Sequence, residues 1–130
     1  MSNHHSETAP GPEFSRMIAS AKASLDAAHP GEHRYRQCLV LQTVRGEEWT
    51  HLLSAGSVEE LIDQSCGVLA QNGWPVISRI VCMWEGGALD VPCGAFLKAL
   101  CAAHEENWNA GILLNAGPAG CAVKRIADIL

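Results

Sequence analysis

The sequence predicts an α/β protein: a three-layer α-β-α sandwich on a mixed sheet. Helix-like and strand-like segments alternate in the order α-β-β-α-β-α-β-α, without an internal repeat. Two strand-helix-strand units follow a hairpin, and parallel strands require crossover helices on the faces of the sheet. The length of 130 residues, with 48% hydrophobic and 18% charged residues, suits a single core. We therefore expect one domain over residues 13–130, after a flexible tail at residues 1–12.

The N-terminal half predicts a helix, a hairpin and a second helix. Apolar residues recur at helical spacing from 14 to 28 and end at the stop signal "HPGEH". β-rich residues flank the polar turn "RGEE", which predicts a hairpin from Arg36 to Ala55. Ser57 then opens an S-x-x-E capping box with Glu60, so the next helix begins there and runs to "NGWP".

The C-terminal half predicts a buried strand, a helix, a second strand and a terminal helix. "VISRIVCMW" has the β-branched, apolar composition of a central strand buried on both faces, and "EGGALD" is a loop. Pro92 suits the first turn of the following helix. "AGILLN" is a short buried strand, "AGPAG" a turn, and "CAVKRIADIL" a brief extended start followed by a helix. The inward stripe of the helix after Pro92 consists of Phe96, Leu97, Leu100 and Cys101.

Composition argues against several classes of partner. Net charge is −5, with 14 acidic against 9 basic residues and no basic run, so we expect no nucleic acid partner. The N-terminus lacks the pattern of a signal peptide and no apolar run approaches the roughly 20 residues of a membrane span, which predicts a cytoplasmic protein without membrane contact. In that compartment we expect reduced thiols that act mostly as small core residues, at Cys38, Cys66, Cys82, Cys93, Cys101 and Cys121.

Two helix starts converge on the place where such folds bind small molecules. Pockets lie at the carboxyl ends of strands, beside the N-termini of the helices that follow, which predicts that Ser57 and Cys93 share one rim. The dipole of the helix after Cys93 favours a thiolate there. Such a thiol suits a nucleophile, a redox group or a ligand contact, and a purely structural cysteine is an equally good interpretation.

The segments "RIVCMW", "VPCGAFLKAL" and "GILLNAGPAGCAVKRIADIL", with Asn72 and Gly73 at a helix end, resemble the cytidine deaminase family. The resemblance covers the C-terminal half closely and the N-terminal half by element order. It implies a zinc ion held by two cysteines of P-C-x-x-C and a Cys or His of a C/H-A-E motif. It also implies that the Glu moves protons while zinc-bound hydroxide attacks the ring carbon that bears the amine. Relatives of this kind are dimers or tetramers, so we expect a homo-oligomer or a partner protein.

The zinc motifs are incomplete in this chain. Cys93 matches the first cysteine of P-C-x-x-C, but Phe96 replaces the second, and a phenyl ring cannot bind a metal. "SVE" at residues 57–59 puts Ser57 at the ligand position and keeps Glu59 as the acid-base residue. Counting back without gaps from Gly73 instead puts Glu60 at the ligand position and Ile62 at the acid-base position.

We therefore expect no cofactor and no bound metal. The alternative is a zinc site rebuilt around Cys93, with a further ligand from Cys66, Cys101, His51 or Asp63.

The candidate site combines residues from four segments. For catalysis we select Cys93, Glu59 and His51, and for ligand binding Trp84, Ser57 and Phe96. Trp84 ends the central strand and can stack on a planar ligand, and the ring of Phe96 makes the pocket apolar. The capping box is the simpler interpretation of Glu59, and a hydrogen-bonded strand histidine is the simpler interpretation of His51.

Three hypotheses follow for function. The first is a divergent deaminase-like protein that acts on or binds a nucleoside-like or other small heteroaromatic molecule through Cys93. The second is a non-catalytic pseudoenzyme that serves as a structural or partner subunit. The third is a zinc-dependent hydrolytic deaminase with an unusual ligand set.

Overall fold

The computed structural model describes residues 11–27, 36–54, 58–116 and 120–130, with the backbone alone at 36, 53, 54 and 58–64. Its helices are α1 (Gly11–Ala27), α2 (Val58–Gln71), α3 (Gly94–Ala103), the 3-10 turn η2 (Glu105–Asn109) and α4 (Ile126–Ile129). Its strands are β1 (Arg36–Thr43), β2 (Glu48–Ser54), β3 (Ile77–Trp84), β4 (Gly111–Asn115) and β5 (Cys121–Arg125). No helix in the described ranges is long and apolar enough to cross a membrane.

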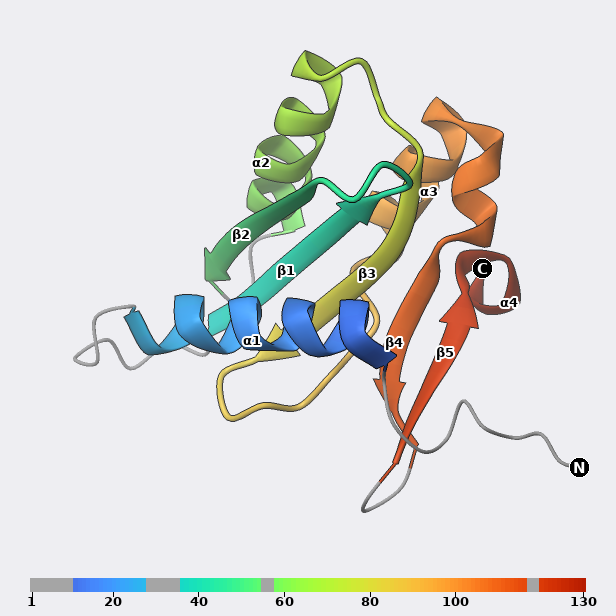
Figure 1. Cartoon of the computed structure of the whole chain (residues 1–130). Helices are drawn as coiled ribbons and strands as arrows, with labels where there is room; N and C mark the ends of the chain where they lie inside the picture. The colour runs from blue at the N-terminus through green and yellow to red at the C-terminus, as the bar shows by residue number, and fades with distance from the viewer. Residues whose placement is uncertain (1–10, 28–35, 55–57, 117–119) are drawn as a thin grey trace, which may run out of the picture.

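The strands form one mixed sheet in the order β2-β1-β3-β4-β5. β3 and β4 are parallel, and the other neighbours are antiparallel. Helix α1 crosses one face, and α2 and α3 cover the other (Figure 1). The predicted three-layer sandwich on a mixed sheet is confirmed, with β3 as the central strand.

Each face of the sheet has its own hydrophobic core, because successive residues of a strand point to opposite sides. From β1, Cys38 and Val40 face α1, whereas Leu39 and Leu41 face α2 and α3. The predicted stripe of α1 is buried on the first face, at Phe14, Met17, Ala21 and Leu25. The predicted stripe of α3 is buried on the second face, at Phe96, Leu97, Leu100 and Cys101.

The C-terminus departs from the sequence prediction. Instead of a brief extended start and a longer terminal helix, residues 121–125 form strand β5, and α4 has only four residues. The Ala, Lys and Arg side chains of this segment favour a helix, but β4 offers a free edge, and five residue pairs of antiparallel pairing use it. At the other end, α1 begins at Gly11, two residues before the predicted domain boundary.

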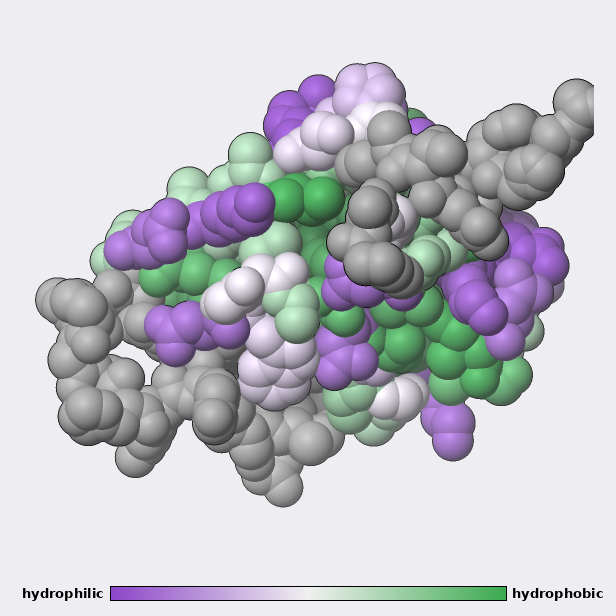
Figure 2. Space-filling model, turned by 90° about the horizontal axis from the view of Figure 1, so that it is seen from below, coloured by the Kyte–Doolittle hydropathy of each residue, from purple (hydrophilic) through white to green (hydrophobic). Residues whose placement is uncertain are grey.

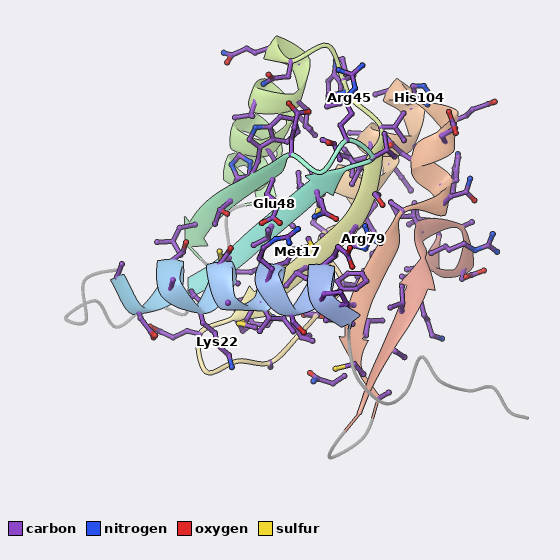
Figure 3. The ribbon with its side chains drawn as sticks, in the orientation of Figure 1. Met17, Lys22, Arg45, Glu48, Arg79 and His104 are labelled. Carbon is purple, nitrogen blue, oxygen red and sulfur yellow. The ribbon has the colours of Figure 1, made fainter. Side chains whose placement is uncertain are left out.

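A chain of polar side chains joins α1 to three strands. Glu48 Oε2 accepts hydrogen bonds from Arg16 Nε at 3.0 Å and from Gln42 Nε2 at 3.3 Å. Gln42 Oε1 in turn accepts from Arg79 Nη1 at 2.9 Å, and the Arg79 guanidinium lies 5.8 Å from the centre of the Phe14 ring. Figure 3 shows Glu48 and Arg79 between the sheet and α1, from which Met17 points inward. This row of hydrogen-bonded side chains fixes where α1 lies on the sheet.

Buried Asn107 ties three elements together on the opposite face. Its Oδ1 accepts a hydrogen bond from the Ile77 amide at 2.8 Å, and its Nδ2 donates to the Leu100 carbonyl at 2.8 Å. The side chain is only 1% exposed, so water does not replace either bond. It therefore joins the start of β3 to the last turns of α3.

We expect Asn107→Ala to lower the free energy of unfolding by about 1–3 kcal/mol, because it leaves the buried Ile77 amide without its partner. It also removes one of the two hydrogen bonds that the Leu100 carbonyl accepts, the other coming from the His104 amide. Urea unfolding followed by circular dichroism measures the loss. Asn109→Ala, at an exposed position of the same turn, is the matched control and should change stability by less than about 0.5 kcal/mol. Equal effects of the two variants would contradict this role.

Gly111 allows β5 to lie close to β4. A Cβ added at this position would lie 2.7 Å from Val123 Cγ1, closer than van der Waals contact. We expect Gly111→Ala to destabilise the protein by about 1–3 kcal/mol through overpacking. Adding Val123→Ala to that variant should restore part of the loss, whereas additive losses in the double variant would exclude this contact as the cause.

Candidate functional site

The candidate site lies at the end of the sheet where the C-termini of β2 and β3 lie. Both strands run antiparallel to β1, so their C-termini lie at the same end, and α2 and α3 begin there. This is the lower end of the molecule in Figure 1. Figure 2 looks onto it and shows hydrophilic and hydrophobic residues side by side. Such a mixture suits a ligand with an apolar ring and polar edges.

Cys93 immediately precedes α3. Its carbonyl accepts the first helical hydrogen bond from the Leu97 amide at 3.1 Å, and its thiol makes no capping hydrogen bond. The side chain is half-buried and packs against the core on the α2 and α3 face. The thiol thus lies between the hydrophobic core and the end of the sheet.

Strand register brings two more predicted residues to the same face. His51 pairs with Leu39, and Leu39 pairs with Cys82. One row further toward the end of β3, Trp84 pairs with Gln37. Because paired residues share a face and Leu39 belongs to the core under α2 and α3, all of these side chains point to that layer. The structure therefore brings His51 and Trp84 into the layer that also contains Cys93.

Gln37 is the residue that sequence reasoning missed. It is half-buried and lies directly opposite Trp84, with amide groups that can both donate and accept hydrogen bonds. The sequence could have indicated its position, because residues 37, 39 and 41 are spaced by two on one strand and therefore lie on the same face. Recognising its partner requires the strand register.

Trp84 is oriented by the loop that follows it. Its indole Nε1 donates to Asp90 Oδ2 at 3.0 Å, and Asp90 Oδ1 accepts from the Val91 amide at 2.7 Å. The Asp90 amide also donates to the Cys82 carbonyl at 2.9 Å. The loop between these residues turns at Gly86 and Gly87, whose φ angles of 102° and 99° suit glycine. The indole is thus held at the end of β3 before any ligand binds.

His51 is an uncharged residue within the layer. Its side chain is 8% exposed, and burial lowers its pKa. Among the described residues its Nε2 is buried without a hydrogen-bond partner. The hydroxyl of Ser65, on the facing helix α2, is the other buried side-chain group without a partner among the described residues.

Three of the six cysteines are core residues. Burial raises the pKa of Cys82 to about 12, with the Asp90 charge as a second cause, and raises the pKa of Cys38 to about 11. Burial also raises the pKa of Cys101. These thiols stay protonated at neutral pH, as expected of structural cysteines.

Two predicted residues fall where the structure says little. Ser57 lies outside the described residues. Glu59 lies in the first turn of α2, beside the end of β2, but its side chain is not described. The proposed capping box and the choice between the two alignments of this segment stay predictions.

The residues present do not fit the zinc site that the resemblance implies. Phe96, at the position of the second cysteine, is fully buried in the core under α3 and has no exposed surface. Cys101 follows Cys93 by eight residues of helix, a rise of about 12 Å, which is too far for one zinc ion to bind both thiols. Among the described residues, no three His, Cys, Asp or Glu side chains are grouped so that they could hold a metal.

Solved structures with the same architecture are bacterial enzymes. The cytidine deaminase of Mycobacterium leprae superposes with a TM-score of 0.66 at 14% identity, over 92% of this chain and 98% of that chain. The protein has a cytidine deaminase-like fold. The cytidine deaminase of Mycobacterium tuberculosis gives a TM-score of 0.60 at 16% identity, over 92% and 95% of the two chains. That of Burkholderia pseudomallei gives 0.61 at 16% identity, over 89% and 94%.

At this identity the likeness establishes the fold and not the activity. No protein-family model matches the chain, and no curated protein matches it by sequence. The chemistry has to be argued from this chain's own residues.

The lowered pKa of His51 predicts a pH dependence of stability. Above pH of about 6.5 the histidine is neutral in both folded and unfolded chains, and its contribution is complete. As pH falls below that value, His51 binds a proton more readily in the unfolded chain than in the folded chain. The free energy of unfolding therefore decreases until the pH passes the pKa of His51 in the folded protein. The slope for one proton cannot exceed about 1.4 kcal/mol per pH unit.

Urea unfolding between about pH 7 and pH 5 measures this slope. We expect His51→Gln to reduce it, while His104→Gln, a matched change at a less buried position, should leave the contribution of His51 in place. An unchanged slope in His51→Gln would show that His51 is not the group responsible.

Proposed function

We propose that this protein binds a small planar heteroaromatic molecule, nucleoside-like in shape, at the ends of β2 and β3, without a resident zinc ion. The observation that carries the proposal is the shared layer of Trp84, His51 and Cys93, which strand register and the start of α3 create. It is supported by the fold, since the similar solved structures are cytidine deaminases.

The available side chains suggest distinct roles in binding. Trp84, held by Asp90, offers a ring face for stacking. Gln37 can hydrogen-bond to a carbonyl and an amine on the edge of the ligand. The thiol of Cys93 contacts the ligand from the start of α3, and we assign Ser57 and Glu59 to the same site on the sequence pattern alone. Phe96 supports the site from the core without contacting the ligand, since its ring has no exposed surface.

The same arrangement contains a nucleophile for a catalytic form of the proposal. The thiol of Cys93 can add to an electron-poor ring carbon once a base removes its proton. The carbon–sulfur bond forms as the adjacent C=N π bond opens, and the ring nitrogen takes the electron pair and then the proton from the base. Glu59 and His51 are the candidate bases, and neutral His51 has a nitrogen lone pair with which to accept the proton. This role requires the His51 ring to turn toward the thiol, because its Nε2 is buried.

Binding is tested by a thermal-shift screen of nucleosides, nucleobases and related heteroaromatic molecules, followed by calorimetry on the best of them. We expect Cys93→Ala and Trp84→Leu each to weaken binding by about tenfold, the scale of one lost stacking or polar contact. Trp108→Leu removes a tryptophan that is 39% exposed on η2, and it should bind normally. Unchanged affinity in both Cys93→Ala and Trp84→Leu would contradict the proposal.

Zinc content separates the proposal from hydrolytic deamination. The buried ring of Phe96 predicts less than about a tenth of an equivalent of zinc in protein made in zinc-replete medium, because an open catalytic site needs three specific ligands. Elemental analysis by mass spectrometry measures it. A full equivalent that is lost in Cys93→Ala would establish a metal site instead.

A second candidate function is that of a subunit without catalysis. Strand β2 forms one edge of the sheet, and Leu52 on it is 38% exposed, which leaves a surface that another chain can pair with or cover. Light scattering of the purified protein, alone and with candidate partners, decides whether it assembles. A stable assembly combined with no response in the ligand screen would favour this role over ligand binding.

A further inference from the structure

A cavity lies at the opposite end of the sheet from the candidate site. It has a volume of about 450 Å³ and is enclosed by the turn between β1 and β2, the segment after α2, and His104 at the end of α3. Figure 3 shows Arg45 and His104 at this end, at the top of the view. The length of β3 separates it from Trp84, a distance of about 23 Å for seven residues of strand. The volume is in the range of small-molecule pockets.

Trp74 supplies the aromatic surface of this cavity. Helix α2 ends in a Schellman motif: the Trp74 amide donates to the Leu69 carbonyl at 2.8 Å, and the Gly73 amide donates to the Ala70 carbonyl at 3.1 Å. The motif explains the turn at Gly73 and the packing of Trp74 on the core that contains Leu69.

The motif does not explain the backbone of Trp74 itself. Its φ of 52° is positive, a conformation that a bulky side chain rarely adopts, and it is the only described non-glycine residue with one. The following proline, Pro75, disfavours most conformations of the residue before it except extended ones. A strained residue that persists in a cavity wall is a reason to look for a ligand there.

The charged and titratable side chains that line the cavity with Trp74 are those of Arg45, Glu47 and His104. Arg45 and Glu47 belong to the same turn, and no ion pair joins them. One carboxylate oxygen of Glu47 accepts a hydrogen bond from the Thr43 hydroxyl at 3.4 Å, which leaves the other for a ligand. His104 Nδ1 accepts from the Glu106 amide at 3.2 Å, so in the neutral ring the proton is on Nε2, which is a donor.

This set of groups selects for one class of ligand. Arg45 and Glu47 carry opposite charges, so the wall is dipolar and has no net charge when His104 is neutral. A carbonyl can accept from Arg45 or His104, while an amine or ring N–H donates to Glu47. The flat face of the same molecule stacks on Trp74. These are the pairings by which arginine, glutamate and aromatic rings recognise the edge and face of a nitrogen heterocycle.

We propose that this cavity is a second binding site, for a neutral planar nitrogen heterocycle that carries a carbonyl beside an amine or N–H group. The site is independent of the one proposed at Cys93, and neither requires the other. Its distance from Trp84 makes it a site for a second molecule and not an extension of the first.

The four tryptophans of the chain provide a direct test, because each indole N–H gives its own signal in a nitrogen-15 NMR spectrum. Phe substitutions assign the four signals. The probe is 1-methylcytosine, with benzoate as an aromatic anion for comparison. We expect 1-methylcytosine to shift the Trp74 signal in a saturable manner and benzoate to shift it little.

Charge-neutral variants then test the two polar walls. Arg45→Gln and Glu47→Gln, both at exposed turn positions, should each weaken the Trp74 response by about tenfold, as for one lost charge-assisted hydrogen bond. Lys98→Gln and Glu13→Gln remove the same charges from an exposed position on α3 and a partly exposed position on α1. Both should respond as the unmodified protein does.

The outcomes for the two sites can be told apart. A shift of Trp74 without Trp84 supports the second site and counts against the proposed function for this probe. A shift of the Trp84 signal alone supports the proposed function and overturns the second site. An anion site would bind benzoate more strongly than 1-methylcytosine. Benzoate binding would then weaken in Arg45→Gln and stay equal or strengthen in Glu47→Gln, and this result would overturn the proposal of a heterocycle site. An unmoved Trp74 signal with every probe would also overturn it.

Discussion

Strand β1 is hydrogen-bonded along both of its edges, and its register decides which residues of the sheet meet which helices. Residues at odd positions face α2 and α3, and those at even positions face α1. A slip of one residue would move Leu39 and Leu41 out of their core and would also turn Gln37 away from α3. The free energy of burying two hydrophobic cores therefore also positions the polar residues of the candidate site.

Phe96 shows how packing and metal chemistry compete for one position. A zinc ligand has to present a thiolate to an open, polar site, whereas this ring is enclosed on all sides by the core of α3. A fully buried phenylalanine stabilises a protein by several kcal/mol relative to alanine, on the order of 3–5 kcal/mol. The position thus contributes to folding in a way that a metal ligand would not. A deaminase-like fold persists because the sandwich depends on burial and pairing and not on the ion.

Local patterns were enough to predict most elements. The stripes of α1 and α3, the hairpin and the central strand each follow from apolar spacing within one segment. β5 was missed because its pairing partner, β4, overrides a local preference for helix. In the candidate site, Cys93 was visible as a motif, but the positions of Gln37 and of the buried His51 ring depend on neighbours distant in sequence. The strained backbone of Trp74 had no sequence signal beyond the "NGWP" helix end.

The chain of polar side chains under α1 has a consequence for how that helix finds its place. Hydrophobic contact alone would tolerate several alignments of α1, because apolar surfaces attract without direction. The alignment observed lets Arg16 reach Glu48 while Glu48, Gln42 and Arg79 stay joined across three strands. Another alignment of α1 would leave the carboxylate of Glu48, which is 20% exposed, without its partner Arg16. These polar groups favour one alignment of α1 on the sheet. They do so mainly by destabilising the other alignments, and less by adding stability to the observed one.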